Sequence, residues 1–379
     1  MKKLIVLITF INVGLLGCQM NLTEKDETDG LSNETFYVGG DFSYVNEMLN
    51  CGAVYRVNGE LIDPYTLFGT RGANISRLRL WHSPDWNKGY SGYLDVEEAI
   101  KRSKKAGMEI LLDFHYSDTW ADPQHQVIPK AWEDIEDVAI LTDSLYEYTF
   151  RTLASLHAKG LAPAFVQVGN EVNIEIMQDS AHMVVDSIDW NRNLHLLNAG
   201  LAAVEDFEKE YEVRIETMIH IAQPENALWW FSEAEKHGIS DFDWMGLSYY
   251  PKWSTYGLDS LGIALDSLIS TYQKGLMIVE TAYPYTLENV DEAGNILGQD
   301  AIIPGYPATP KGQHDFMQKL VEITSTAGGK GVIYWEPAWV TSDCSTLWGK
   351  GSHWDNATFF DAANGNEALE VFQIFAQSQ

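Results

Sequence analysis

The chain has 379 residues, of which 12% are aromatic and 13 are tryptophan, and its formal net charge at pH 7 is −29. A negative field of this size repels nucleic acids and anionic polymers, so neither a polynucleotide nor a polygalacturonate-like partner is expected. The length suits one large domain or two smaller ones. Many tryptophans in an acidic chain suit flat surfaces on which sugar rings stack, which makes a neutral polysaccharide the expected partner.

The first 17 residues are typical of an export signal. A basic start, Met1 to Lys3, precedes an apolar run at 4–16 that is too short to span a bilayer. Residues 15–18 (LLGC) resemble the lipobox of bacterial lipoproteins, whose cysteine receives the lipid. We therefore expect residues 1–17 to be removed, Cys18 to be lipidated, and the protein to be an exported lipoprotein of the outer membrane that faces the cell surface. The alternative is an ordinary buried N-terminal strand or helix.

The segment after Cys18 predicts a flexible acidic tether that ends at residue 35, because it is rich in Asp, Glu and Thr and lacks apolar periodicity. Besides Cys18, the chain has only Cys51 and Cys344. Two cysteines cannot form the disulfide framework of a small secreted domain. A Cys51–Cys344 bridge and two free thiols stay open as alternatives.

From residue 36 to 379, short apolar runs alternate with longer helical patterns, as in parallel βαβ units. Strands are expected at 36–44, 75–81, 109–116, 164–171, 216–222, 244–250, 276–281 and 331–339, with helices such as 96–106, 138–157, 191–211 and 310–327. Eight such units predict an α/β fold, a single-domain (β/α)₈ TIM barrel. A doubly wound open sheet is the alternative, but no Gly-rich phosphate turn follows any of the strands.

Polar or aromatic side chains gather at the ends of most predicted strands. They are Asp41, 77–81, 113–116, 170–171, 248–250, Glu280 and 335–336. The C-terminal ends of the strands form the active site of a (β/α)₈ barrel. Glu171 and Glu280 end the fourth and seventh strands, on facing sides of the mouth. Two carboxylates about 5–5.5 Å apart are what a retaining glycoside hydrolase requires, so this pair is the predicted catalytic pair.

Several short sequence blocks, taken together with the two glutamates, resemble one family. They are 40–43 (GDFS), 77–81 (RLRLW), 113–123 (DFHYSDTWADP), 167–171 (QVGNE), 247–251 (LSYYP), 280–283 (ETAY) and 331–339 (GVIYWEPAW). In this order they resemble glycoside hydrolase family 53, the endo-β-1,4-galactanases, from about residue 36 to 361. The resemblance implies hydrolysis of β-1,4-galactosidic bonds in galactan and type I arabinogalactan, the side chains of pectin, with retention of configuration.

The resemblance implies that Glu171 is the acid/base and Glu280 the nucleophile. An acid needs a raised pKa, whereas a nucleophile needs hydrogen-bond donors that keep it ionised. Arg79 is the expected donor to Glu280, and Tyr250 a second one. Asn170 is expected to bond the sugar 2-hydroxyl.

Further side chains are expected to bind the substrate or shape its cleft. Asp113 and His115 are expected to shape the site through hydrogen bonds, and Asp41 belongs to the same strand-end set. The tryptophans after or at strand ends are candidates for stacking on sugar rings, although each can equally be a core residue. They are Trp81, Trp86, Trp120, Trp335 and Trp339.

Bacterial members of the family often bind a calcium ion between the loops that follow the last two barrel strands, and the resemblance implies such a structural site here. The oxygen ligands expected from residues 289–295 and 352–355 are Asn289, Asp291, Asn295, Ser352 and Asp355. The chain departs from the family pattern at Asn289, where Asp is usual, and at Ala293, where a side-chain ligand is usual. We expect these departures to weaken the site, and a solvated polar loop is the alternative. No cofactor is expected for the chemistry itself.

Two other functions stay open. One is a retaining glycosidase of the same clan acting on another neutral β-glycan such as mannan. The other is a lipid-anchored glycan-binding protein without catalysis, which the presence of both glutamates disfavours. The expected partners are galactan and galacto-oligosaccharides, together with the membrane through the lipid anchor, and the protein is expected to act as a monomer.

Overall fold

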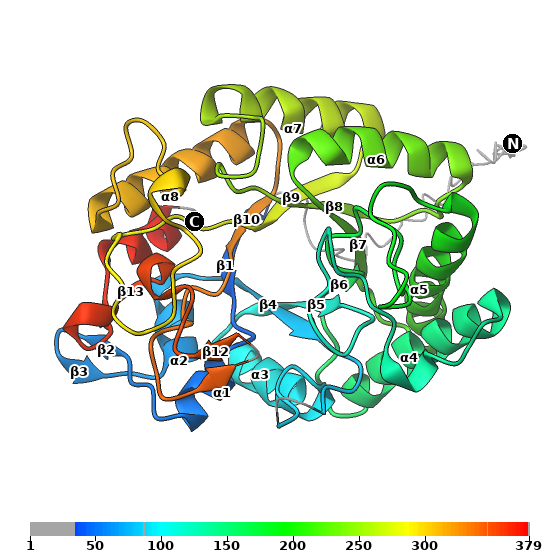
Figure 1. Ribbon diagram of the computed structural model, residues 1–379, viewed down its shortest axis with the longest axis horizontal. Helices are drawn as coiled ribbons and strands as arrows, with labels where there is room; N and C mark the ends of the chain where they lie inside the picture. The colour runs from blue at the N-terminus through cyan, green and yellow to red at the C-terminus, as the bar shows by residue number, and fades with distance from the viewer. Residues whose placement is uncertain (1–34, 86–87, 347, 378–379) are drawn as a thin grey trace, which may run out of the picture. The chain divides into compact units, whose positions relative to one another are not determined.

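Eight parallel strands form a closed barrel in the computed structural model, which describes residues 35–85, 88–346 and 348–377 (Figure 1). The barrel strands are β1 (Tyr37–Asp41), β4 (Ile75–Leu80), β5 (Glu109–Phe114), β6 (Phe165–Val168), β7 (Glu216–Ala222), β8 (Trp244–Ser248), β9 (Gly275–Glu280) and β10 (Gly331–Tyr334). Each pairs with its neighbours in sequence, and β1 closes the ring between β4 and β10. The predicted TIM barrel is confirmed, and the open doubly wound sheet is wrong.

Helices surround the barrel between successive strands (Figure 1). They are α1 (Val45–Asn50), α2 (Pro64–Arg71), α3 (Tyr93–Lys105), α4 (Val138–His157), α5 (Trp190–Tyr211), α6 (Pro224–His237), α7 (Leu258–Tyr272) and α8 (Pro310–Thr326). Side-chain caps define several starts: Asp63, Asp137, Asp189 and Thr309 each accept a hydrogen bond from a backbone N–H of the first turn. Three of these caps begin helices expected from the sequence, namely α4, α5 and α8, whereas the fourth expected helix, α3, begins after Gly92 without a side-chain cap.

Small elements outside the barrel were not predicted. The strands β2 (Arg56–Val57), β3 (Glu60–Leu61), β13 (Phe360–Asp361) and β14 (Glu367–Ala368) form a four-stranded sheet. The strands β11 (Ser345–Thr346) and β12 (Gly349–Lys350) form a hairpin. The 3₁₀ segments are η1 (Lys130–Trp132), η2 (Gln299–Ala301), η3 (Asp355–Ala357), η4 (Ala362–Asn364) and η5 (Glu370–Gln377). Within the described ranges, no helix is both long and apolar enough to cross a membrane.

The barrel interior changes from apolar to polar along the strands. An inner apolar cluster fills one level; it consists of Tyr37, Ile75, Leu111, Phe165, Met218, Trp244, Met277, Val279 and Ile333. Two residues further along their strands come Arg77, Asp113, Gln167 and His220, all buried. Because alternate residues of a strand share a face, these polar side chains also point inward and form the next level. The apolar cluster is therefore the floor of a polar layer at the C-terminal ends of the strands.

A disulfide joins the first barrel segment to the last. Cys51 follows α1 and Cys344 precedes β11; their Cα atoms are 5.3 Å apart although 293 positions separate them in sequence. Of the two alternatives for these cysteines, the structure has the bridge and not the free thiols. A cross-link over so long a loop restricts the unfolded chain strongly.

Removing this bridge should lower thermal stability. We expect the double variant Cys51→Ser/Cys344→Ser to lose about 2–4 kcal/mol of unfolding free energy, because its unfolded chain regains the entropy of an open loop. The melting midpoint, measured by circular dichroism without reductant, should fall by about 3–6 °C. Wild-type protein unfolded with dithiothreitol is the matched control, and equal midpoints for wild type and variant would contradict a bridge in the folded protein.

Candidate active site

A buried arginine lies at the centre of the polar layer. The guanidinium of Arg77, on β4, contacts Asp41 at 2.9 Å, Asp113 at 2.9 Å and Glu280 at 2.8 Å. It also donates to Oδ1 of Asn170 at 2.6 Å. Burial alone would lower the pKa of Arg77, but the surrounding carboxylates raise it above its ordinary value. Arg77 is therefore a permanent cation that connects residues of β1, β5 and β9 and the end of β6.

Glu280 points into the barrel because β9 is irregular at its end. Val279 faces the inner apolar cluster, so simple alternation would turn Glu280 outward. The register between β8 and β9 shifts just before Ser248, which then pairs with Glu280. Such a bulge re-aims a side chain, and bulges are frequent beside active sites. It brings the Glu280 carboxylate to the guanidinium of Arg77.

The donors to Glu280 differ in part from those expected. The hydroxyl of Tyr250 donates to Glu280 at 3.4 Å, as predicted. Arg79 does not contact Glu280; it pairs with Glu336 at 2.6 Å, and Arg77 is the cation on Glu280. Arg77 and Arg79 share a face of β4, so the alternation of side chains places both inside the barrel. It does not say which of the two lies at the level of Glu280. The prediction chose the wrong one of the two.

Arg79 lies among aromatic rings beside the cleft. Its Cζ is 4.3 Å from the ring centroid of Tyr44, 4.9 Å from that of Trp81 and 4.4 Å from that of Trp120. Each contact is favourable because a ring face is negatively polarised. Trp120 is partly exposed, whereas Trp81 is fully buried. Arg79 thus supports a cleft wall from behind and does not face the cleft.

Glu171 follows β6, three strands from β9 around the barrel. The chain turns there through Gly169, at φ +84°, and through Glu171 itself, at φ 43°. A Cβ on Gly169 would lie 2.5 Å from the side chain of Val172, so glycine is required on two grounds. Positive φ at a residue other than glycine is strained, and such strain clusters at active sites. Oxygens of Glu171 and Glu280 and a ring nitrogen of His220 all lie within 4.8 Å of one another.

The two glutamates differ in their electrostatic surroundings. Burial is the main cause that raises the pKa of both carboxyls. Glu280 raises the pKa of Glu171 further, while Arg77 opposes the rise at Glu280. Two carboxylates this close titrate as a pair, and the first proton leaves Glu280, where the cation is. The pair can therefore hold one ionised nucleophile and one protonated acid at the same time.

The pair opens into a cleft of about 520 Å³. Four of the predicted substrate-binding residues line it: Trp120, Asn170, Tyr250 and Trp335. Asn170 is held on both sides of its amide, because Oδ1 accepts from Arg77 and Nδ2 donates to the carbonyl of Ala121 at 2.7 Å. A partly apolar cleft with a few fixed polar groups is typical of a site that binds a small molecule or part of a polymer.

The remaining predicted residues do not line the cleft. Asp41, Arg79, Trp81, Asp113, His115 and Trp339 are buried outside its lining. Side chains at a strand end can lie under the mouth as well as in it. Trp81 and Trp339 take the core position that was their alternative. A role of Asp41 and Arg79 in binding substrate stays a prediction. His115 bonds Asp113 at 3.0 Å and accepts from the indole of Trp81, so these residues do form the predicted hydrogen-bonded support. Trp86 lies outside the described residues.

Other cleft residues were missed by sequence reasoning. Gln223, Asn226, Trp253, Ile296 and Trp354 line the cleft together with 122–125. Trp253 comes three residues after Tyr250 in an aromatic block, which is a signal that was available. Gln223 follows β7 at φ 68°, a conformation that no residue pattern announced. Ser248, which lies beneath Glu171, belongs to the block 247–251 but was given no role there, and His220 beside it carries no motif of its own.

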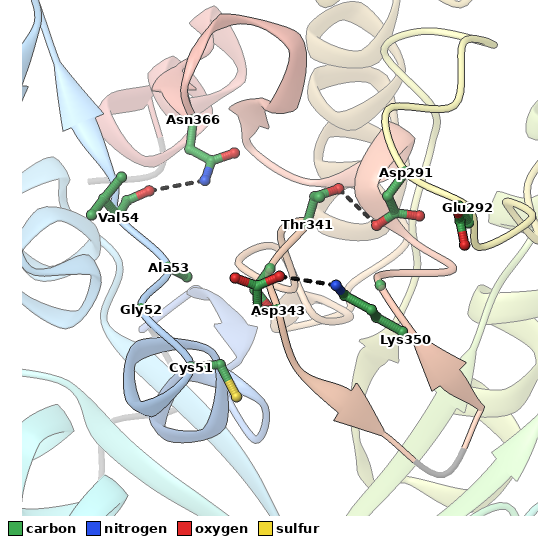
Figure 2. A pocket seen from close by; sticks show the side chains of 12 residues that line it. Cys51, Gly52, Ala53, Val54, Asp291, Glu292, Thr341, Asp343, Lys350 and Asn366 are labelled. Carbon is green, nitrogen blue, oxygen red and sulfur yellow. Dashed lines mark hydrogen bonds and ion pairs between the residues drawn. The ribbon is translucent and has the colours of Figure 1, made fainter.

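A second hollow of about 490 Å³ lies beside Cys51 (Figure 2). None of the twelve described residues that line it is aromatic. An ion pair between Asp343 and Lys350 crosses it, and the Asn366 amide donates to the carbonyl of Val54. Without an aromatic face it lacks the platform that sugar rings need.

The predicted calcium ligands come together where the loops after β9 and β10 meet. Asp291 accepts from the backbone N–H of Ser352 at 2.8 Å, and Asn295 donates to Asn289 at 2.6 Å. The hydroxyl of Thr341 bridges Asp291 and Asp355. Oδ1 of Asp355 and Oδ1 of Asn295 are buried and find no hydrogen-bond donor in the part of the chain that the structure describes. Two such oxygens fit the needs of a cation with oxygen ligands.

The comparisons with known proteins agree with this geometry. The arabinogalactan endo-β-1,4-galactanase of Cellvibrio japonicus is 53% identical over 99% of this chain and 97% of its own. The endo-β-1,4-galactanase of Bacillus subtilis is 36% identical over 81% of this chain and 71% of its own. The structure of the family 53 catalytic domain of Ignisphaera aggregans superposes with a TM-score of 0.81 at 28% identity, over 91% of this chain and 96% of that one.

The family model described as glycosyl hydrolase family 53 matches residues 37–375. This range contains all eight strands of the barrel and both glutamates of the pair. The chain therefore belongs to glycosyl hydrolase family 53.

Proposed function

We propose that this protein is a retaining endo-β-1,4-galactanase that cleaves galactan and type I arabinogalactan, with Glu171 as acid/base and Glu280 as nucleophile. The observation that carries the proposal is the unequal pair of glutamates at the barrel mouth, of which only Glu280 contacts the buried cation Arg77. The named galactanases to which the chain is similar support the choice of galactan.

The reaction takes two steps. In the first, a carboxylate oxygen of Glu280 forms a bond to the anomeric carbon while the glycosidic C–O bond breaks, and the proton of Glu171 passes to the leaving oxygen. In the second, Glu171 removes a proton from water, whose oxygen displaces Glu280 and restores the original configuration. Arg77 and Tyr250 hold Glu280 for attack, and Asn170 is placed to bond the 2-hydroxyl of the sugar.

The cleft favours a neutral polymer. Trp335 contacts both Trp120 and Trp354, at ring-centroid distances of 5.8 Å and 4.6 Å. Aromatic faces pack on the C–H faces of sugar rings, and the net charge of −29 disfavours an anionic chain. A retaining enzyme for another β-glycan such as mannan is the second candidate, because the catalytic pair is common to both.

Linear galactan should be cut and mannan should not. Reducing ends should appear from galactan with a rapid early fall in viscosity, because an endo-acting enzyme cuts within chains. Equal rates on the two polymers would support the second candidate. Release of no ends from either would contradict catalysis and leave glycan binding.

Substitutions at the two glutamates should separate their roles. Glu171→Ala and Glu280→Ala should each lower kcat on galactan by at least roughly 10²–10⁴-fold, as expected when a proton-transfer group or a nucleophile is lost. With an activated aryl galactoside and azide, Glu171→Ala should yield the β-galactosyl azide, since azide attacks the glycosyl-enzyme. Glu280→Ala should yield the α-azide, since azide takes the place of the carboxylate. The reverse stereochemistry, read by NMR, would exchange the two assignments.

We propose a structural calcium ion between the loops after β9 and β10. Asp291, Asp355, Asn295 and Asn289 would hold it, with Ser352 beside them. The ion would neutralise the two carboxylates; burial is the main cause that raises the pKa of Asp355, and Asp291 adds to it. The site has an amide at Asn289, where the family pattern has Asp, and no side-chain ligand at Ala293, so its affinity is expected to be modest.

Calcium should stabilise the protein without being needed for the chemistry. After treatment with EDTA, millimolar CaCl₂ at about 100 times Kd should add about 2.7 kcal/mol of stability. The melting midpoint should then rise by about 4 °C. Asp355→Asn is the matched control, since it keeps the shape and loses the charge, and its midpoint should respond much less. Identical midpoints of the wild type with EDTA and with calcium would leave a solvated loop as the alternative.

We further propose that the protein is exported and anchored through a lipid on Cys18 at the outer surface of the cell, where it works as a monomer. The predicted signal at 1–17, Cys18 and the tether up to residue 34 lie outside the described residues. The Cys51–Cys344 bridge supports export, because disulfides persist in oxidising compartments.

Replacing Cys18 should release the protein from membranes. In a bacterial host with lipoprotein processing, the wild type should pellet with the membrane fraction, and Cys18→Ala should be found in the soluble fraction with its galactanase activity retained. Cys51→Ser is the matched control and should stay with the membranes. A Cys18→Ala protein that still pellets would contradict the lipid anchor.

A further inference from the structure

A chain of hydrogen bonds runs from Glu171 into the barrel. The hydroxyl of Ser248, at the end of β8, donates to Oε1 of Glu171 at 2.5 Å. Ser248 in turn lies 2.9 Å from Nε2 of His220 on β7. Both Ser248 and His220 are fully buried, so water does not compete for these bonds.

The direction of the chain follows from the ring of His220. Burial, with help from Arg77, lowers the pKa of His220 well below its ordinary value, so the ring is neutral and carries one proton. Its Nδ1 lies 3.3 Å from the backbone N–H of Glu171 and 3.1 Å from the amide nitrogen of Gln167, which are both donors. Oδ1 of Asn170, at 2.9 Å, is the one acceptor there.

Two donors facing Nδ1 favour a lone pair on that nitrogen, and Oδ1 of Asn170 already accepts from Arg77. The proton of His220 is then on Nε2, and this N–H donates to Ser248. Since the Ser248 oxygen accepts from His220, its own proton is free to go to Glu171. The imidazole thus fixes the serine as a donor towards the acid/base.

Several charged or titratable groups face Glu171 from the surrounding elements. Glu280 on β9 and Asp122 after β5 oppose its ionisation, as does burial. Arg77 on β4 favours it, and Tyr250 after β8 and His220 on β7 are neutral. Of the hydrogen bonds among the described residues, the one from Ser248 is the bond that reaches the carboxylate of Glu171.

We propose that Ser248, oriented by His220, is a positioning residue for the acid/base: it binds Oε1 of Glu171, so that Oε2 carries the proton to and from the glycosidic oxygen. The inference rests on the proposed function. Because Ser248 donates a hydrogen bond, it can bind ionised Glu171 and orient the carboxylate when Glu171 acts as base. The same hydrogen bond offsets part of the free-energy cost of burying the ionised carboxylate.

Ser248→Ala tests the proposal with the removal of one oxygen atom. Loss of the donor should raise the pKa of Glu171, so the alkaline limb of kcat/KM on galactan should move up by about one pH unit. Glu171 stays protonated to higher pH because its own ionised form is no longer stabilised by the serine. With a carboxylate that is no longer held, kcat on galactan should fall about tenfold while KM stays the same.

An activated substrate separates positioning from a structural role. For 2,4-dinitrophenyl β-galactobioside, the leaving group departs without a proton, so kcat/KM of Ser248→Ala should stay within about threefold of wild type. A loss of structure would lower the rates on both substrates together. His220→Gln keeps the serine but removes its orienting partner, and should move the alkaline limb in the same direction by a smaller amount.

Ser76→Ala is the matched control. Ser76 is a buried serine on the barrel strand β4 that bonds Ser103 of α3, away from the cleft. Its variant should keep the pH profile of wild type. An alkaline limb of Ser248→Ala that is unmoved or lower would overturn the proposal, whatever the rate. A wild-type enzyme that is inactive on galactan but cleaves another β-glycan such as mannan would instead overturn the proposed substrate, and the alkaline limb measured on that glycan would still decide the role of Ser248.

Discussion

The charge of Arg77 is the constraint on which the site depends. A guanidinium within a barrel loses its hydration, and only close anions and hydrogen-bond acceptors offset that cost. Arg77 finds them on three other strands and at the end of a fourth, through Asp41, Asp113, Glu280 and Asn170. A shift of any of these strands along its neighbour would leave a buried charge without its partner. The cation therefore helps to fix the register of the strands that carry the site.

The same cation makes the catalytic pair asymmetric. Both glutamates are desolvated, and the difference between them lies in what each contacts: Arg77 for Glu280, and the neutral hydroxyl of Ser248 for Glu171. A full charge stabilises an anion more than a neutral donor does. Glu280 is thus the first of the two carboxyls to ionise, while Glu171 keeps its proton to higher pH.

The sequence alone was sufficient to predict the barrel and to pick out Glu171 and Glu280. It was insufficient to predict how deep each strand-end side chain lies in the barrel and which residue it contacts. Strand-end residues could be recognised because seven of the eight predicted strands end in polar or aromatic side chains. Alternation along β4 could not tell Arg77 from Arg79, because both share a face. The inward turn of Glu280 depends on a bulge between β8 and β9 that leaves no mark in a single sequence. Trp81 and Trp120 look equivalent in their motifs, and only packing around Arg79 shows which of them is buried.

The place of the disulfide has a consequence for how the barrel comes apart. The ring closes where β1 meets β10, which brings the two ends of the chain's barrel together at one seam. Peeling of a terminal strand is the easiest local opening for a closed sheet, and it would start at this seam. Cys51 and Cys344 join the segments that follow these two strands. With the segments beyond this seam joined covalently, β1 and β10 stay close together even when the hydrogen bonds between them break.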